Sequence, residues 1–326
     1  MSAPATLVVV NPAAAAGRTG REWPLIRDAL DEAGVEFEHR LTLARGDATA
    51  ITRAALAAGT ERVVAVGGDG TLNEVANGFF GENGGPPIRP GAVLGMVPAG
   101  TGGDFRRSAG IPREPHAAAV LLARGDRRPC DVGRIEYLGA DGAAIGVHHF
   151  INIADCGLGG EVALRAAGPT KRAGGRATFA WAAMRSVVSY GRKPARVVAD
   201  GVPIEGPMQN VVLANGRYFG GGMLVAPDAD LADGMLDVVV IGDIGRLRSL
   251  LGMPRIYRGA HIGRPGVLVM RAARVEVTPL EGAQMLFDVE GEQIGAAPAI
   301  ATVLPAALDL CAPRPRGGPV PAGPAS

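Results

Sequence analysis

Apolar and polar positions in the first part of the chain form two alternating kinds of segment. Residues 6–10, TLVVV, form after the first threonine an unbroken, largely β-branched apolar run that ends at Asn11-Pro12, as expected of a strand buried on both faces. Further strands are predicted at Val35–Leu41, Arg62–Val66 and Val93–Val97, with helices near residues 20–33, 47–58 and 71–80. Strands that alternate with helices indicate right-handed crossovers and a parallel sheet.

The pattern changes after residues 126–129. Short strand-like runs then dominate, interrupted by one helical pattern at Ala173–Ser189: Asp131–Tyr137, Val147–Ile153, Ala195–Ala199, Asn210–Ala214, Leu236–Ile241, Val267–Met270, Arg274–Thr278 and Gln284–Asp288. The sequence therefore predicts a two-domain fold, with an N-terminal parallel α/β domain at 1–128 and a C-terminal β-sandwich-like domain at 129–312. Residues 313–326 contain too little apolar surface to pack, and we expect them to be disordered.

Composition excludes several classes of protein. Lys and Arg total 33 against 32 Asp and Glu, so a net charge of +1 supplies no field to attract nucleic acid. The three cysteines form no CxxC pair, and no apolar stretch is long enough to span a membrane. The N-terminus lacks the basic region of a signal peptide, which favours a cytoplasmic protein. Neither Lys171 nor Lys193 follows a glycine, so the chain has no Walker A loop.

The strongest local signal is a glycine-rich turn at residues 67–74, GGDGTLNE, between a predicted strand and a predicted helix. Its glycines, Gly67, Gly68 and Gly70, allow the backbone to approach a ligand closely. The start of the next helix presents unpaired N–H groups that suit a phosphate. Such a turn also occurs as a plain helix start, with Thr71 and Glu74 forming a capping box.

A second turn of the same kind, AGTGGD at residues 99–104, follows the next predicted strand and adds the hydroxyl of Thr101. The carboxyl ends of neighbouring parallel strands share one edge of a sheet, where ligands bind. We therefore expect the two turns to lie side by side, with Asn11 and Thr42 facing the same crevice.

Taken together, these motifs resemble the bacterial soluble lipid kinases of the diacylglycerol kinase superfamily. Asn11-Pro12, residues 67–74 and residues 98–101 carry the resemblance in the first domain. The stretches 215–223 and 226–238, NGRYFGGGM and APDADLADGMLDV, carry it in the second. The first glycine turn also occurs in NAD kinases, but an NAD kinase would not explain the second-domain motifs.

The resemblance implies an ATP site between the two domains and a kinase that phosphorylates a lipid hydroxyl. Asp69 would act near the phosphates through magnesium-bound water. The predicted nucleotide-binding residues are Asn11, Thr42, Gly67, Gly68, Asp69, Gly70, Thr71, Asn73, Gly100 and Thr101. The loop after Asn11 lacks the family's usual serine, so we expect Arg18 to take more of the phosphate contact. Gly103 replaces the usual asparagine before Asp104.

The resemblance also implies a structural Mg²⁺ in the second domain, bound by the Asp230 and Asp233 carboxylates and the Met235 carbonyl. Two carboxylates three residues apart in a glycine-containing turn suit a hard, oxygen-binding cation. A solvated acidic turn is the alternative.

The family's catalytic base is the glutamate of an Asp-Gly-Glu turn, which corresponds here to Glu290-Gly291-Glu292. We assign the base to Glu292, with Glu290 as the rival. Replacing Asp69 with Asn should stop phosphoryl transfer and leave stability nearly unchanged, because the turn depends on its glycines. A non-catalytic nucleotide-binding regulator is the remaining alternative, which intact Asp69 and Glu292 disfavour.

Two segments of the second domain, 165–196 and 244–275, contain eight and seven basic residues and no acid. Such segregation predicts peripheral docking on an anionic membrane, and two ordinary solvated faces are the alternative. The sequence does not distinguish diacylglycerol, phosphatidylglycerol, a sphingoid base or a polyprenol as the acceptor. It also leaves a homodimer open.

Overall fold

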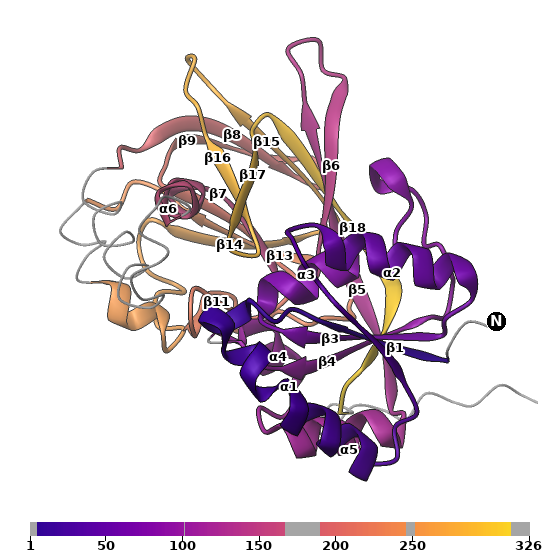
Figure 1. Ribbon diagram of the computed structural model, residues 1–326. Helices are drawn as coiled ribbons and strands as arrows, with labels where there is room; N and C mark the ends of the chain where they lie inside the picture. Colours follow the sequence, from indigo (N-terminus) through magenta and orange to yellow (C-terminus); the bar gives the residue numbers. More distant parts are fainter. Residues whose placement is uncertain (1–4, 101, 167–189, 246–251, 314–326) are drawn as a thin grey trace, which may run out of the picture.

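The computed structural model describes residues 5–100, 102–166, 190–245 and 252–313. The predicted helix at 173–189, residue Thr101, most of the tail and much of the basic segment 165–196 lie outside the described residues. Where it is described, the chain forms an N-terminal α/β domain below a strand-rich domain (Figure 1).

The N-terminal domain is a parallel sheet covered by helices on both faces. Its strands run in the order β2-β1-β3-β4, with bounds Thr6–Val10 (β1), Glu38–Leu41 (β2), Arg62–Gly67 (β3) and Val93–Pro98 (β4). The helices are α1 (Ala14–Glu32), α2 (Asp47–Ala58), α3 (Asp69–Asn77), the short 3-10 helix η1 (Glu82–Gly84), α4 (Asp104–Ala109) and α5 (Pro115–Arg124). Helices α2 and α3 cover one face and α1 and α5 the other (Figure 1). The predicted parallel α/β architecture is confirmed.

The C-terminal domain is a sandwich of two sheets. One sheet is antiparallel, in the order β14-β13-β10-β7-β16-β17. The other contains β5, β6, β8, β9, β15 and β18, and its inner face packs on the first sheet around a core that includes Phe150, Leu213 and Phe287. The bounds are Arg127–Leu138 (β5), Ala144–Phe150 (β6), Ile153–Gly157 (β7), Lys193–Ala199 (β8), Val202–Met208 (β9), Asn210–Ala214 (β10), Tyr218–Phe219 (β11), Met223–Leu224 (β12), Leu236–Ile241 (β13), Val267–Ala272 (β14), Arg274–Pro279 (β15), Leu286–Val289 (β16), Glu292–Ala296 (β17) and Ala299–Cys311 (β18), with helix α6 at Leu158–Ala166.

Strand β18 joins the two domains. Its first half pairs with β15 and β5 in the sandwich, and its end pairs in parallel with β4, where Asp309 and Leu310 lie opposite Val93 and Leu94. The C-terminal part of the chain therefore returns to extend the N-terminal sheet. One continuous sheet crosses the domain boundary, which sets the position of each domain relative to the other.

No helix among the described residues is long and apolar enough to cross a membrane.

Candidate active site

The two glycine turns lie in direct contact at the carboxyl ends of β3 and β4. A Cβ atom added to Gly100 would lie 2.4 Å from the Gly68 Cα, so position 100 requires glycine for this approach. The Ala99 N–H donates to the Gly67 carbonyl at 2.9 Å, and an Arg18 Nη2 donates to the Gly100 carbonyl at 3.2 Å. The expectation that the turns share one edge of the sheet agrees with this geometry.

The first turn opens helix α3 without a side-chain cap. Gly68 is the N-cap residue, and no side chain bonds the first amides of the helix. Thr71 Oγ1 instead accepts from Asn11 Nδ2 at 3.0 Å, and the Glu74 carboxylate accepts from the Ala48 N–H at 3.3 Å. The capping box considered above is therefore absent. The start of α3 keeps its backbone donors and the positive end of its dipole available to an anion.

Asp69 joins the two turns. Its Oδ2 accepts from the Gly103 and Asp104 N–H groups at 2.9 and 3.1 Å, and its Oδ1 accepts from the Phe105 N–H at 3.3 Å. A carboxylate that holds three backbone amides stabilises the fold by more than a neutral side chain could. The expectation that Asp69 contributes little to stability does not fit this geometry.

Asp104 continues this network into the second domain. Its buried carboxylate accepts from Arg107 Nη1 at 2.5 Å and from the Gly221 N–H at 2.7 Å. Burial, together with the nearby Asp69, raises the pKa of Asp104 above its ordinary value, against the hydrogen bond from Gly221 and the Arg107 charge. The glycine motif at 220–222, which the sequence indicated only as a family signature, thus makes one of the contacts between the domains.

Four of the predicted residues line one small cavity between the domains, of about 40 Å³: Gly70 and Asn73 from α3, and Glu290 and Glu292 from the β16–β17 hairpin. A Cβ on Gly70 would meet nothing within 4 Å, so this side of the turn is open. The remaining lining residues are Thr49, Glu74, Asn77, His148 and Val289. The cavity lies where α3 and the β16–β17 hairpin face each other.

Glu290 and Gly291 form the two-residue turn of the hairpin, at φ 56° and 88°. Both positive values are those of a type I′ turn, in which glutamate is unfavourable. The Glu290 Oε1 offsets this strain, since it accepts from the Ile151 and Asn152 N–H groups at 2.9 and 2.7 Å. Its Oε2 is buried and has no hydrogen-bond partner among the described residues. Burial raises the pKa of Glu290 to about 8, so this carboxyl holds a proton at neutral pH.

Glu292 has a different environment two residues later. It starts β17, its side chain is 34% exposed, and its Oε2 lies 2.5 Å from Arg45 Nη2. This ion pair crosses the domain boundary. The neighbouring His148 is neutral near pH 7, because burial and then the charge of Arg45 lower its pKa to about 4.

Several residues of this site escaped the sequence analysis. Asn77 Nδ2 donates to the His149 carbonyl at 2.9 Å, and Asn77 Oδ1 accepts from the His149 N–H at 3.0 Å, which ties the end of α3 to β6. Arg45 follows Thr42 by three residues in the loop after β2. Position at the carboxyl end of a parallel strand was the signal that could have identified Arg45.

The other predicted residues that the structure describes do not line this cavity. Thr42 is buried at the end of β2, where its N–H donates to the Val10 carbonyl at 2.9 Å. Asp230 and Asp233 lie in the loop before β13, where each carboxylate accepts from a backbone amide two residues on, and Asp233 also pairs with Arg271. Burial, with contributions from Asp230 and Asp131, raises the pKa of Asp233.

The donor set of this loop is only partly that of a metal site. No three Asp, Glu, His or Cys side chains converge as a ligand group within the described ranges. Asp131 lies nearby, but its two carboxylate oxygens accept from the Gly234 and Ala306 N–H groups. Two carboxylates and backbone carbonyls still suit a hard cation, provided that Arg271 leaves Asp233.

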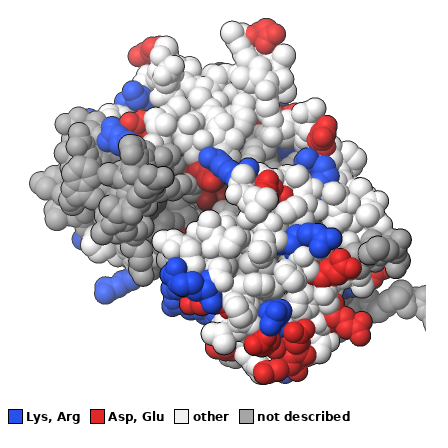
Figure 2. Space-filling view, in the orientation of Figure 1, with Lys and Arg blue, Asp and Glu red and all other residues white. Residues whose placement is uncertain are grey.

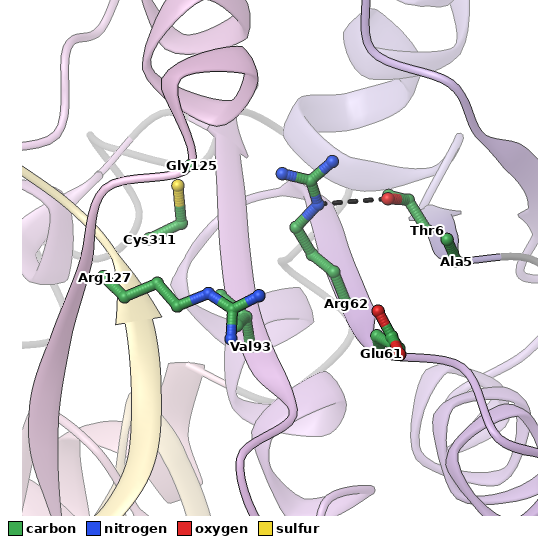
Figure 3. Close-up of a pocket in the computed structure, with 8 residues that line it drawn as sticks. All are labelled: Ala5, Thr6, Glu61, Arg62, Val93, Gly125, Arg127 and Cys311. Carbon is green, nitrogen blue, oxygen red and sulfur yellow. Dashed lines mark hydrogen bonds between the residues drawn. The ribbon is translucent and has the colours of Figure 1, made fainter. Parts of the chain in front are cut away.

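A larger cavity, of about 170 Å³, lies at the opposite edge of the parallel sheet, between the first residues of β1, β3 and β4 (Figure 3). Arg62 extends along it and donates to Thr6 Oγ1 at 3.1 Å and to the Leu122 carbonyl at 2.7 Å. It contains neither glycine turn. Ligands of such sheets bind at the other edge, so the smaller cavity is the candidate site.

Comparison with known proteins agrees with this geometry. Residues 5–135 match the diacylglycerol kinase catalytic domain, and residues 154–312 match the YegS C-terminal NAD kinase beta sandwich-like domain. A probable lipid kinase YegS-like of Pseudomonas aeruginosa is 34% identical over 80% of this chain and 84% of its own length. The diacylglycerol kinase of Bacillus subtilis is 28% identical over 89% of this chain and 90% of its own length.

Solved structures show the same fold. A crystal structure of a putative diacylglycerol kinase from Bacillus anthracis superimposes with a TM-score of 0.75 at 23% identity, covering 96% of this chain and 99% of that one. The chain belongs to the YegS-like and diacylglycerol kinase family of lipid kinases. It is therefore a kinase, and the resemblance identified in the sequence is confirmed.

Proposed function

We propose that this kinase transfers the terminal phosphate of ATP to a hydroxyl group of a membrane lipid such as diacylglycerol. The observation that carries the proposal is the cavity in which the uncapped start of α3 faces the carboxylates of the β16–β17 hairpin. One wall can hold phosphates through backbone N–H groups, and the other can accept a proton. These are the two requirements of phosphoryl transfer to an alcohol.

Glu292 is the proposed base. The acceptor hydroxyl oxygen attacks the γ-phosphorus, the bond from that phosphorus to the β–γ bridging oxygen breaks, and the hydroxyl proton passes to the Glu292 carboxylate. Glu290 is less suited because its raised pKa leaves it protonated at neutral pH, where it cannot accept a proton. Asp69 positions the second glycine turn through its three backbone hydrogen bonds.

Magnesium is part of the proposal. The ion supplies charge neutralisation at the phosphates, and a second ion would be held by Asp230, Asp233 and the Met235 carbonyl. Wild-type protein should then melt at a higher temperature in Mg²⁺ than in EDTA, and Asp233→Ala should reduce that difference. A wild-type melting temperature that is indifferent to Mg²⁺ would remove the structural ion from the proposal.

Docking on an anionic membrane is also proposed, from the basic segments 165–196 and 244–275. Much of the first segment lies outside the described residues. On the face shown in Figure 2, basic and acidic side chains are interspersed and much of the strand-rich domain is uncharged. Co-sedimentation with vesicles should rise with anionic lipid content and fall with salt. Binding that ignores both would favour solvated faces.

The decisive experiment is incubation with γ-labelled ATP and a lipid extract, followed by identification of the labelled species. A labelled lipid phosphate confirms the activity and names the acceptor. Labelled NADP in the presence of NAD would favour the NAD kinase alternative. Nucleotide binding without transfer to any lipid or to NAD would favour a non-catalytic regulator.

A further inference from the structure

The candidate cavity presents an electrostatic problem for a triphosphate. Three glutamates line it, Glu74, Glu290 and Glu292, and its histidine, His148, is neutral near pH 7. Glu290 is protonated at neutral pH and adds no charge, but the carboxylates of Glu74 and Glu292 would repel a phosphate. The sequence places no lysine near either glycine turn. A cation of the protein beside the cavity would therefore decide how well the terminal phosphate is held.

Arg45 is such a cation. Its Nη2 lies 2.5 Å from Glu292 Oε2, and its charge contributes to the lowered pKa of His148, another lining residue. The Arg45 side chain is nevertheless 70% exposed. Among the described parts of the chain, this is the one ion pair that a cavity-lining residue makes. The guanidinium is thus at the cavity and still accessible from solvent.

The turn that carries Arg45 is held in place relative to the phosphate-binding helix. Asp47 Oδ2 accepts from the Leu43 and Ala44 N–H groups at 2.7 and 2.8 Å, which fixes the turn at the start of α2. Helix α2 is tied to α3, because Thr49 Oγ1 donates to the Glu74 carbonyl at 2.8 Å. Arg45 therefore belongs to the nucleotide wall, whereas Glu292 belongs to the opposite domain.

We propose that Arg45 is a ligand of the terminal phosphate that Glu292 holds in place until the nucleotide arrives. A planar guanidinium binds phosphate oxygens in pairs, and a phosphate carries more charge than the single carboxylate it replaces. Transfer of Arg45 to the phosphate releases Glu292 to face the acceptor hydroxyl. The proton acceptor is thus freed when the group to be transferred is bound. The inference rests on the proposed use of ATP and on Glu292 as the base.

The test is calorimetric binding of a non-hydrolysable ATP analogue and of ADP, each with Mg²⁺. Arg45→Met should weaken binding of the analogue by about tenfold, the lower end of the range for a hydrogen bond to a charged group. The same substitution should weaken the binding of ADP much less, because ADP lacks the terminal phosphate. Arg45→Lys should restore part of the loss. Arg40→Met is the matched control, because Arg40 is exposed, lies five residues earlier and forms an ion pair with its neighbour Glu38.

Glu292→Gln should change the affinity for the ATP analogue in the opposite direction. It breaks the same ion pair but removes a competitor of the phosphate, so it should tighten binding of the analogue. If the pair only fastens the domains together, both variants lower the melting temperature and neither changes analogue affinity, which would overturn the proposal. Equal losses for the analogue and ADP in Arg45→Met would also overturn it. Failure of the wild-type protein to bind either nucleotide would instead contradict the proposed function.

Discussion

The two walls of the cavity are built in different ways. The wall formed by the glycine turns presents backbone amides, and the residues of each turn lie within a few positions of each other, between a strand and the helix that follows it. The wall formed by the β16–β17 hairpin presents carboxyl groups. Glu290 accepts from the Ile151 and Asn152 amides, and Glu292 pairs with Arg45. Local geometry shapes each turn of the first wall, and contacts between residues far apart in the sequence position the carboxyl groups of the second.

The difference follows from what each wall must do. Amides at a helix start carry fixed partial charges and bind an anion without changing protonation. The charge of a carboxyl group instead depends on its environment, and burial raises the pKa of Glu290. Glu290 and Glu292, two residues apart, show how strongly the tertiary environment separates chemically identical side chains.

The sharpest test of the wall formed by the β16–β17 hairpin compares the steady-state turnover of Glu292→Gln with that of Glu290→Gln. Loss of a general base should lower the kcat of Glu292→Gln by about 10²–10⁴-fold. Glu290→Gln should lose much less, because glutamine resembles the protonated carboxyl and keeps an oxygen for the two amides. The reverse order would move the base to Glu290, and equal small losses would exclude both.

The wall formed by the glycine turns should be sensitive to added side-chain volume. Gly100→Ala places a methyl group 2.4 Å from the Gly68 Cα, and overpacking of this kind should lower the free energy of unfolding by about 3 kcal/mol. Gly70→Ala is the control, since its added Cβ meets nothing within 4 Å. It should unfold at the wild-type denaturant concentration but bind nucleotide less well. Equal stability of the two variants would show that the turns do not pack as described.

Asp69 links the wall formed by the glycine turns to the rest of the site. Asp69→Asn should lower the free energy of unfolding by about 2 kcal/mol, because the neutral amide has one acceptor oxygen for three backbone donors. Phosphoryl transfer should also be lost. Asp200→Asn is a matched control, since Asp200 accepts from the Ala273 and Arg274 N–H groups. It should lower stability but keep wild-type turnover, and a comparable loss of turnover there would show that Asp69 has no special role.

The strand-rich domain also contains a buried pair of acidic residues, Asp155 and Asp288, which lie opposite each other on the neighbouring strands β7 and β16. Burial raises the pKa of both, that of Asp288 to about 7. An acid with a raised pKa favours the folded state when protonated, so stability should fall as pH rises from about 4 to about 7.

Asp288→Asn tests this linkage by chemical denaturation between pH 5 and pH 8. The variant should lose about 2.5 kcal/mol less stability than the wild type over that range, because one pKa unit corresponds to about 1.4 kcal/mol and the wild type titrates over about two units of it. Asp141→Asn, in the exposed turn between β5 and β6, should leave the wild-type slope unchanged. Parallel slopes for the wild type and Asp288→Asn would show that this pair is ionised throughout.

Much of the fold was predictable from the chain. The apolar runs at β1, β3, β4, β10 and β13 are near-continuous and bounded by turn residues, so their limits agree with the structure within one or two residues. Strand β18 was missed, although it is long, because Pro305 and the alanines around it give no clear alternation. Its pairing with both β4 and β15 could not be inferred, since register between distant strands depends on the whole sandwich.

The sequence by itself determined the glycine turns, the parallel order of their strands and the family, because these depend on neighbouring residues and on backbone freedom. Only the tertiary structure decided which charges meet. It brought Arg45 into an ion pair with Glu292, which lies 247 residues away in the sequence. It also brought three backbone N–H groups within hydrogen-bond distance of the Asp69 carboxylate. Electrostatic interaction depends on distance and burial, and neither quantity exists until the two domains have packed together.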